Sequence, residues 1–244
     1  MKFTELMRIY CDDYTTQGDL TVVPSIIHPS YRFTMSGSTL DYDRYLAMVE
    51  SALGDHFPDL GLVVHDLFAD DDRIALRFSE HATWTNGNRA VWMGISMYRR
   101  AGDGRLSECL VEQDFYGRRQ QLSSGVADPL PAAMDDPWST AVAAEEPDAV
   151  AVARAWALKA PLPAPVRAED VVIEDAFGSG RKVALRLRID GTYRGGLFGI
   201  PDEAVGAPCW IHVNTISHVG DGRVTDSWAV SDRFGLRNRL KEAT

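Results

Sequence analysis

The chain has 244 residues, of which 45% are hydrophobic and 25% are charged, a composition typical of an ordinary globular protein. Its formal net charge of −10 argues against nucleic acid or an anionic membrane as a partner, because both would repel it. The three cysteines are widely spaced without a CxxC pair, and no stretch has the apolar run of a signal peptide or a membrane span. We therefore expect a cytoplasmic protein without disulfides.

Helices are predicted first along the chain. Apolar residues at three-to-four spacing indicate an amphipathic helix over residues 3–17, and a short helix over 20–28 ends before a proline. A brief strand is expected at 31–35. The next helix begins after SGSTLD, whose Ser and Thr can cap it, and extends to Leu53.

The hydrophobic period then changes from helical to strand-like. β-Branched and aromatic residues bounded by turn sequences indicate four strands. The expected strands span residues 62–68, 74–85, 90–99 and 106–116. Helices followed by a strongly bent antiparallel sheet predict an α+β fold.

These strands recur in the second half of the chain. Residues 63–84 align without a gap with residues 172–193, and residues 92–122 align with residues 210–240. Sixteen of the 53 aligned positions are identical, so a duplication is the economical explanation.

The repeat predicts two domains, residues 1–124 and 138–244. Between them, residues 125–137 combine small residues, proline and acid without periodicity, which is typical of a linker. The second copy opens with Trp138–Ala144 and a helix around Pro147–Lys159. Fewer residues precede its first repeated strand than in copy one, so we expect it to keep the sheet and lose part of the helical layer.

Three segments together resemble a known family. FPDL at 57–60 precedes the first long strand, GTYRGGLFGIP occupies 191–201, and DGRVTDSWAVSDRFGLRNRL closes the second copy at 221–240. They resemble signatures of the SnoaL-like polyketide cyclases, which have the nuclear-transport-factor-like cone fold. The resemblance implies two tandem cone-shaped α+β-barrel domains, each a curved antiparallel sheet wrapped on helices. The histidine expected after Gly-Thr is replaced by Trp84 and Tyr193 in the two copies.

Asp114 is the leading catalytic candidate. Period-two alternation places it on one face of the last strand of copy one, together with Leu110 and Glu112. If this face lines the cone, burial raises the pKa of the aspartate and suits it to exchange a proton near neutral pH. Glu112 would couple to it as a like charge. The alternative is a structural Asp114 that caps the strand or binds an arginine.

The resemblance implies the same chemistry, since the aspartate of the WxxxD signature in the cyclases acts as acid/base in an intramolecular aldol closure that needs no metal and no cofactor. His81 is a further catalytic candidate, as a hydrogen-bond donor to a developing enolate. Copy one is favoured as the active copy because Val230 stands in copy two where copy one has Glu112. The candidate substrate-binding residues are Trp84, Tyr10, Tyr14 and Trp92, and the second-copy equivalents are Asp232, Trp228 and Tyr193.

These observations predict a cofactor-independent cyclase or isomerase, of the isomerase or lyase class, that acts on a keto-containing natural product. Its ligand would be small and hydrophobic with polar decoration. One alternative is an epoxide hydrolase or epoxide-opening cyclase, which needs an Asp–Arg–Asp-like cluster in the pocket. The other is a non-catalytic ligand-binding or assembly module. The two copies are expected to form an intramolecular pseudo-dimer, and they could also pair again as a homodimer. The sequence lacks GxSxG, HExxH, a phosphate-binding loop and a zinc cluster, so we expect no metal site.

Overall fold

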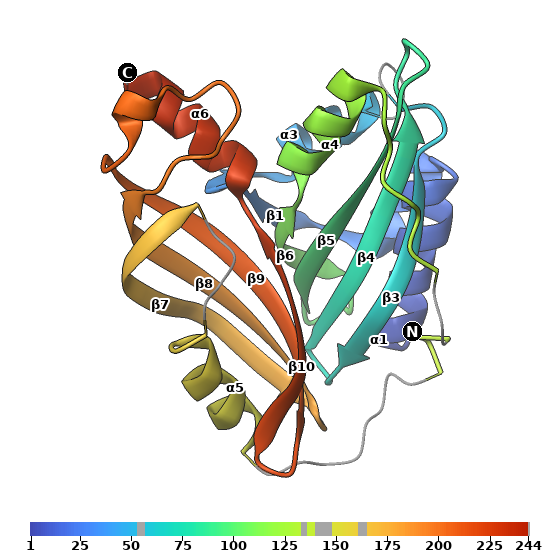
Figure 1. Ribbon diagram of the computed structural model, residues 1–244. Coiled ribbons are helices and arrows are strands. Elements are labelled where there is room, and N and C mark those ends of the chain that lie inside the picture. The colour runs from blue at the N-terminus through green and yellow to red at the C-terminus, as the bar shows by residue number, and fades with distance from the viewer. Residues whose placement is uncertain (53–56, 133–135, 140–147, 161–164, 244) are drawn as a thin grey trace.

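The computed structural model describes residues 1–52, 57–132, 136–139, 148–160 and 165–243. Two curved sheets contact each other, and each carries helices on its other side (Figure 1). The chain is therefore α+β, as predicted. The expected end of a helix at Leu53, part of the Trp138–Ala144 segment and Pro147 lie outside the described residues.

The first domain has a six-stranded sheet in the order β2-β1-β6-β5-β4-β3. Its pairs are antiparallel except β1 with β6, which run parallel. The strands are β1 (Ile27–Met35), β2 (Ser38–Leu40), β3 (Gly61–Ala69), β4 (Arg73–Thr83), β5 (Arg89–Arg100) and β6 (Leu106–Gln113).

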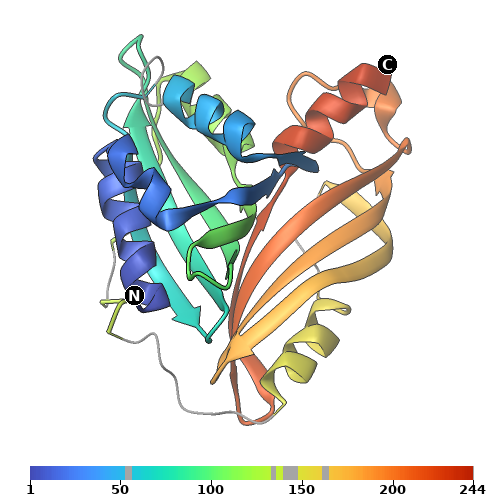
Figure 2. The same cartoon turned by 180° about the vertical axis from the view of Figure 1, so that it is seen from behind.

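Helices cover one face of this sheet (Figure 2). They are α1 (Phe3–Arg8), the π-helical segment η1 (Ile9–Thr16), the 3₁₀ turn η2 (Leu20–Val22), α2 (Val23–Ile26), α3 (Tyr42–Ser51) and α4 (Phe115–Ser124). The predicted helix over 20–28 was too long at its end, since β1 begins at Ile27. His28 precedes Pro29, and a residue before proline disfavours helical backbone angles. Asp41, rather than the Ser or Thr of SGSTLD, caps α3 by accepting a hydrogen bond from the Arg44 N–H.

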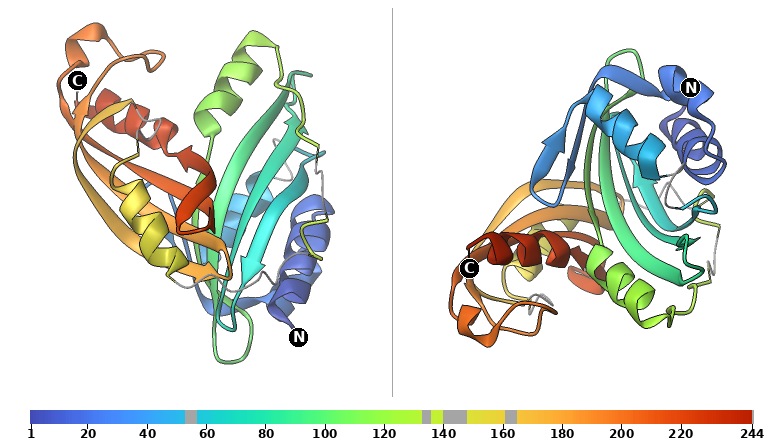
Figure 3. Two further views of the ribbon diagram at one scale, coloured as in Figure 1. Left: turned by 60° about the horizontal axis from the view of Figure 1, so that its bottom comes forward. Right: turned by 90° about the horizontal axis from the view of Figure 1, so that it is seen from above.

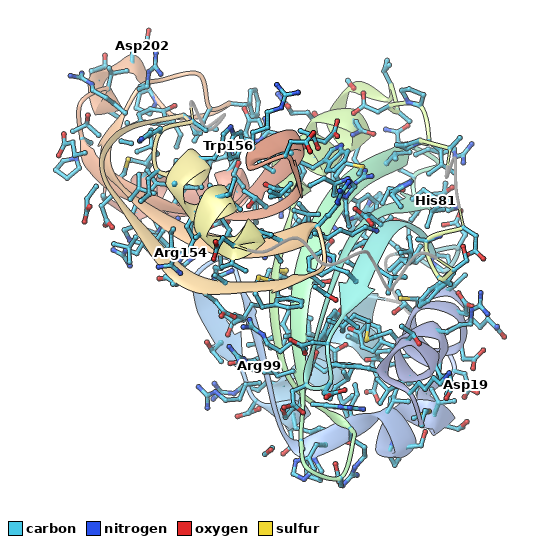
Figure 4. The ribbon with its side chains drawn as sticks, turned by 90° about the horizontal axis from the view of Figure 1, so that it is seen from below. Asp19, His81, Arg99, Arg154, Trp156 and Asp202 are labelled. Atoms are coloured by element: carbon cyan, nitrogen blue, oxygen red, sulfur yellow. The ribbon has the colours of Figure 1, made fainter. Side chains whose placement is uncertain are left out.

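The second domain has four antiparallel strands in the order β10-β9-β8-β7 and fewer helices. Its strands are β7 (Val166–Ser179), β8 (Lys182–Tyr193), β9 (Pro208–Gly220) and β10 (Arg223–Ser231), and its helices are α5 (Ala149–Ala157), the short η4 (Asp202–Ala204) and α6 (Arg233–Ala243). Buried alanines 149, 153 and 157 let α5, which carries Arg154 and Trp156 (Figure 4), lie close to the sheet. The expected reduction of the helical layer is confirmed.

The two sheets lie side by side (Figure 3), and apolar side chains join them. Phe68, Ile95 and Met97 of the first sheet form one buried cluster with Phe177 and Ile216 of the second. Ion pairs surround it, including Arg73 with Asp175 and Lys182 with Asp66. Much of the space between the two sheets is therefore filled by protein, and the larger cavity lies on the helical side of the first sheet.

Candidate active site

A cavity of about 1090 Å³ lies between the first sheet and its helices. Its wall is mainly aromatic and aliphatic, from η1, α3, β4, β5, β6 and α4. Phe198, Phe234 and Arg237 of the second domain complete the wall. A pocket of this size and lining suits a drug-sized apolar ligand, which a few polar groups would orient.

Glu80 is the only carboxylate on the described part of this wall. Alternation along β4 turns Leu76, Phe78 and Glu80 inward, and the glutamate is only 9% exposed. Burial raises the pKa of Glu80 to about 7, while the nearby positive charge of Arg118 and hydrogen bonding by side chains of the wall lower it. The carboxyl is therefore poised to give or take a proton near neutral pH.

Three neighbours, Arg118, Trp92 and Gln113, lower the pKa of this carboxyl against the effect of burial. Trp92 lies opposite Glu80 on β5 and donates its indole N–H to Gln113 Oε1 at 2.8 Å. The Arg118 guanidinium stacks on the rings of Phe115 and Trp92, at 4.1 and 5.0 Å. Burial lowers the pKa of Arg118 to about 10, so it stays cationic beside Glu80 at neutral pH.

Phenol groups form the opposite end of the cavity wall. Tyr10, Tyr14, Tyr45 and Tyr98 all line it, and the hydroxyls of Tyr10 and Tyr45 are 2.8 Å apart. Burial raises the pKa of Tyr14 to about 12 and raises those of Tyr10, Tyr45 and Tyr98 as well. The phenols therefore stay protonated and can serve as hydrogen-bond donors.

Asp114 does not line the cavity, contrary to the sequence-based expectation. β6 ends at Gln113, and Asp114 is the N-cap of α4, where its Oδ1 accepts the Gly117 N–H at 3.0 Å. Its Oδ2 accepts a hydrogen bond from Arg233 of the second domain at 2.5 Å. The structural alternative, a capping aspartate bound to an arginine, describes this geometry.

The predicted face of β6 was also wrong. Val111 and Gln113 line the cavity, whereas Glu112 turns toward the second domain and pairs with Arg186 at 3.0 Å. Glu112 is fully buried, and burial raises its pKa to about 8 against the opposing charge of Arg186. It belongs to the contact between the domains, where Asn214 donates to the carbonyl of Leu110.

His81 follows Glu80 on β4 and therefore points to the other side of the sheet, toward the end of the strand (Figure 4). Its ring lies over Gly61, where an added Cβ would come within 2.5 Å of the imidazole. Unlike His81, the four predicted substrate-binding residues all line the cavity: Trp84, Tyr10, Tyr14 and Trp92.

The second-copy equivalents contribute to a packed core and to the interface. Asp232 is buried, accepts the Gly235 N–H at 2.7 Å and pairs with Arg239. Tyr193 Oη accepts the Leu197 N–H at 2.8 Å within the second core. Trp228 lies at the sheet-to-sheet contact under the Arg77 guanidinium.

Glu80, Gln113 and Arg118 were not among the predicted site residues. A usable signal existed for Glu80, since the inward apolar series of β4, Leu76 and Phe78, ends in it. No signal marked Arg118, because its neighbours Phe57 and Trp92 come from distant segments of the chain.

Family models match both halves of the chain. The model described as SnoaL-like polyketide cyclase matches residues 168–240, and the model described as SnoaL-like domain matches residues 8–109. The chain consists of two SnoaL-like domains in tandem. In this SnoaL-like protein the cavity with Glu80 belongs to the first domain.

Single-domain solved structures are similar to about half of the SnoaL-like chain. IdmH from Streptomyces antibioticus is 19% identical, and the alignment covers 50% of this chain and 99% of that one, with a TM-score of 0.46. An LEH-like epoxide hydrolase from M. tuberculosis is 14% identical, with coverages of 51% and 91% and a TM-score of 0.43. An NTF2-like protein of unknown function from Burkholderia pseudomallei K96243 is 17% identical, with coverages of 50% and 99% and a TM-score of 0.43. A comparison with curated proteins gave no match.

Two further searches concern the described residues only. Among them, no three His, Cys, Asp or Glu side chains gather in a way that could hold a metal ion. None of their helices combines the length and the apolar character needed to cross a membrane.

Proposed function

We propose that the first domain catalyses proton transfer on a keto-containing, largely apolar small molecule, as a cofactor-independent cyclase or isomerase, with Glu80 as the acid/base. The observation that carries this proposal is a buried carboxyl, with its pKa raised to about 7, on the wall of a large aromatic cavity. Such a group is half ionised at neutral pH and can both accept and return a proton.

In the proposed reaction, the Glu80 carboxylate removes a proton from the carbon next to a ketone. The C–H electron pair moves into an enolate, whose negative charge the Arg118 guanidinium beside Glu80 stabilises. The enolate carbon then attacks a second carbonyl of the same molecule, which gives ring closure, or regains the proton elsewhere, which gives isomerisation. Glu80 delivers the proton back, so the enzyme ends unchanged.

The surroundings of Glu80 support this role. Arg118 keeps part of the carboxyl ionised, because its charge opposes the effect of burial on the pKa of Glu80. The aromatic wall reduces access of water, which strengthens hydrogen bonds to a developing enolate. Epoxide opening is less well supported, because the described wall carries a single carboxylate rather than an Asp–Arg–Asp cluster.

Deuterium uptake by 2-tetralone in D₂O, followed by NMR, tests the proposal, because exchange next to the ketone requires only the first step. We expect the protein to catalyse exchange with a rate that rises with pH and levels off above about 7. Glu80→Gln should reduce it by about 100-fold or more. The matched control is Glu203→Gln, which removes an exposed carboxylate of the second domain and should leave exchange unchanged.

Two outcomes would overturn the assignment. Equal exchange by wild type and Glu80→Gln would remove Glu80 from the chemistry. Binding of tetralone, detected by tryptophan fluorescence, without any exchange would favour the non-catalytic ligand-binding module.

We further propose that the fused copies replace a dimer of single domains. The repeat aligns Arg73 with Lys182 and Asp66 with Asp175. Arg73 binds Asp175 while Lys182 binds Asp66, so each ion pair is the repeat equivalent of the other, as a two-fold axis requires. With this face occupied, sedimentation equilibrium should give the mass of one chain. A mass of two chains would contradict a closed pseudo-dimer.

A further inference from the structure

The charge on the cavity wall is opposite to that of the chain. The whole protein carries a net charge of −10, yet the described wall has one carboxylate, Glu80, and three guanidinium groups. The charge of Arg118 acts on the neighbouring Glu80 carboxyl. The other two guanidinium groups, of Arg119 and Arg237, lie near an edge of the wall where Phe198 is 70% exposed.

These two arginines come from different domains. Arg119 lies on α4 and Arg237 on α6, and Figure 3, viewed from above, shows the two helices close together. The Arg119 guanidinium stacks 4.3 Å over the ring of Phe234, also on α6. Arg237 Nε donates to the Phe198 carbonyl at 2.6 Å, and the Phe198 N–H donates to Tyr116 Oη at 2.7 Å. These contacts place both cations on one rim.

Other arginines near the domain contact have carboxylate partners. On α6, Arg233 pairs with Asp114 and Arg239 pairs with Asp232. Within the described part of the chain, neither Arg119 nor Arg237 forms an ion pair with a carboxylate. Two cations that lack a counterion among the described residues, at the rim of an apolar cavity, lower the free energy of an anion there.

We propose that Arg119 and Arg237 bind an anionic group, a carboxylate or a phosphate, at one end of a ligand whose apolar body fills the cavity. The planar fork of an arginine matches both anions, and the stacked ring holds the Arg119 side chain in place. The second domain thereby contributes to ligand binding although its own core is packed. This inference rests on the proposed function only in taking this cavity as the ligand site.

Two fluorescent probes of nearly the same shape test the proposal. 1-Anilinonaphthalene-8-sulfonate carries an anionic group, and N-phenyl-1-naphthylamine is the same molecule without it. We expect the wild type to bind both probes. Arg119→Gln and Arg237→Gln should each weaken binding of the sulfonate about fivefold to tenfold, because a charge-assisted hydrogen bond is lost at a partly exposed site. Binding of the neutral probe should change less than twofold.

The matched control is Arg223→Gln, which removes the same charge from an exposed position on β10. It should affect neither probe. Displacement of the neutral probe by dodecanoate and by dodecyl phosphate then tells which anion is preferred, and the preferred one should lose its advantage in Arg237→Gln.

The proposal is overturned if both rim variants leave sulfonate binding unchanged, or if they weaken the two probes equally. Glu80→Gln separates this test from that of the proposed function. It should reduce tetralone exchange by about 100-fold or more and still bind the sulfonate, so either hypothesis can fail without the other.

Discussion

The two SnoaL-like domains share the same arrangement of strands but differ at the residues that form the candidate site. In the repeat alignment, Glu80, Gln113 and Arg118 of the first domain correspond to Ile189, Ser231 and Leu236 of the second. Ile189 and Leu236 are buried in the second core. The two copies thus share strands and helix caps, while the second carries apolar side chains that close its core where the first has an acid and its cation. The same arrangement of strands can thus enclose either a cavity with reactive groups or a core filled by apolar side chains.

Introducing an acid at the equivalent position of the second domain should have the largest effect on stability. Ile189→Glu places a carboxylate in a core where, among the described residues, Leu236 has replaced the cation of the first domain. We expect unfolding free energy to fall by about 4 kcal/mol or more at pH 7, because an unpaired buried charge is costly. Urea denaturation measures it, with a smaller loss at pH 5, where the carboxyl can bind a proton.

The reverse exchange, Glu80→Ile, is the matched control. It removes a desolvated carboxyl but leaves the Arg118 guanidinium without its carboxylate, so we expect a smaller loss of stability than for Ile189→Glu. Equal losses for the two exchanges would mean that the two cores are alike, and the comparison would fail.

The contact between the copies should be affected almost as strongly. Phe68 and Phe177 are repeat equivalents whose rings lie 5.1 Å apart at the sheet-to-sheet contact. Each change to alanine should cost about 3 kcal/mol, since a buried aromatic ring leaves a cavity. The double variant should cost less than the sum because the rings share one contact. Thermal melts of the three variants measure these losses, and Phe198→Ala, at an exposed position, should cost little in the same measurement.

Stability should depend on pH through Glu80. Burial raises the pKa of this carboxyl from 4.5 to about 7, so between these values the folded protein keeps a proton that the unfolded chain has released. The resulting cost is absent below about pH 4.5, grows as pH rises and is complete above about pH 7, where it reaches about 3 kcal/mol.

Because the pKa of Glu112 is also raised, the effect of Glu80 must be isolated as a difference. Unfolding free energies of wild type and Glu80→Gln, measured from pH 4.5 to 8, should diverge up to about pH 7 and stay parallel above it. A constant difference over the whole range would contradict a raised pKa for Glu80.

The two helix caps should show the smallest effects. Asp114→Ala should cost about 1 kcal/mol, the usual value for an N-cap, since its side chain is 29% exposed. Asp232→Ala should cost about 2 kcal/mol, because its fully buried carboxylate also pairs with Arg239. Asp114→Ala should retain tetralone exchange, and loss of exchange at full stability would return catalysis to Asp114.

The caps also show why the sequence pointed to the wrong acid. Asp114 was singled out because alternation placed it on one face with Glu112, and the D-x-x-G pattern at 114–117 also recurs at 232–235. In both copies the aspartate caps a helix, and a Cβ on Gly117 or Gly235 would come within 2.5 or 2.3 Å of the carboxylate. The aspartate that is identical in both copies has a structural role as a helix cap. The candidate acid, Glu80, stands at a position where the two copies differ.

The sequence by itself determined the α+β class, the tandem repeat and the approximate strands, because each depends on local periodicity or internal alignment. It also supplied four aromatic residues that stand on the cavity wall, including Trp84 and Trp92. Alternation in β6 correctly placed Glu112 and Gln113 on opposite faces of the sheet. It did not determine which of the two faces the helices. Only the tertiary structure decided that, since it depends on the side toward which the sheet curves and on the second domain that covers the other face.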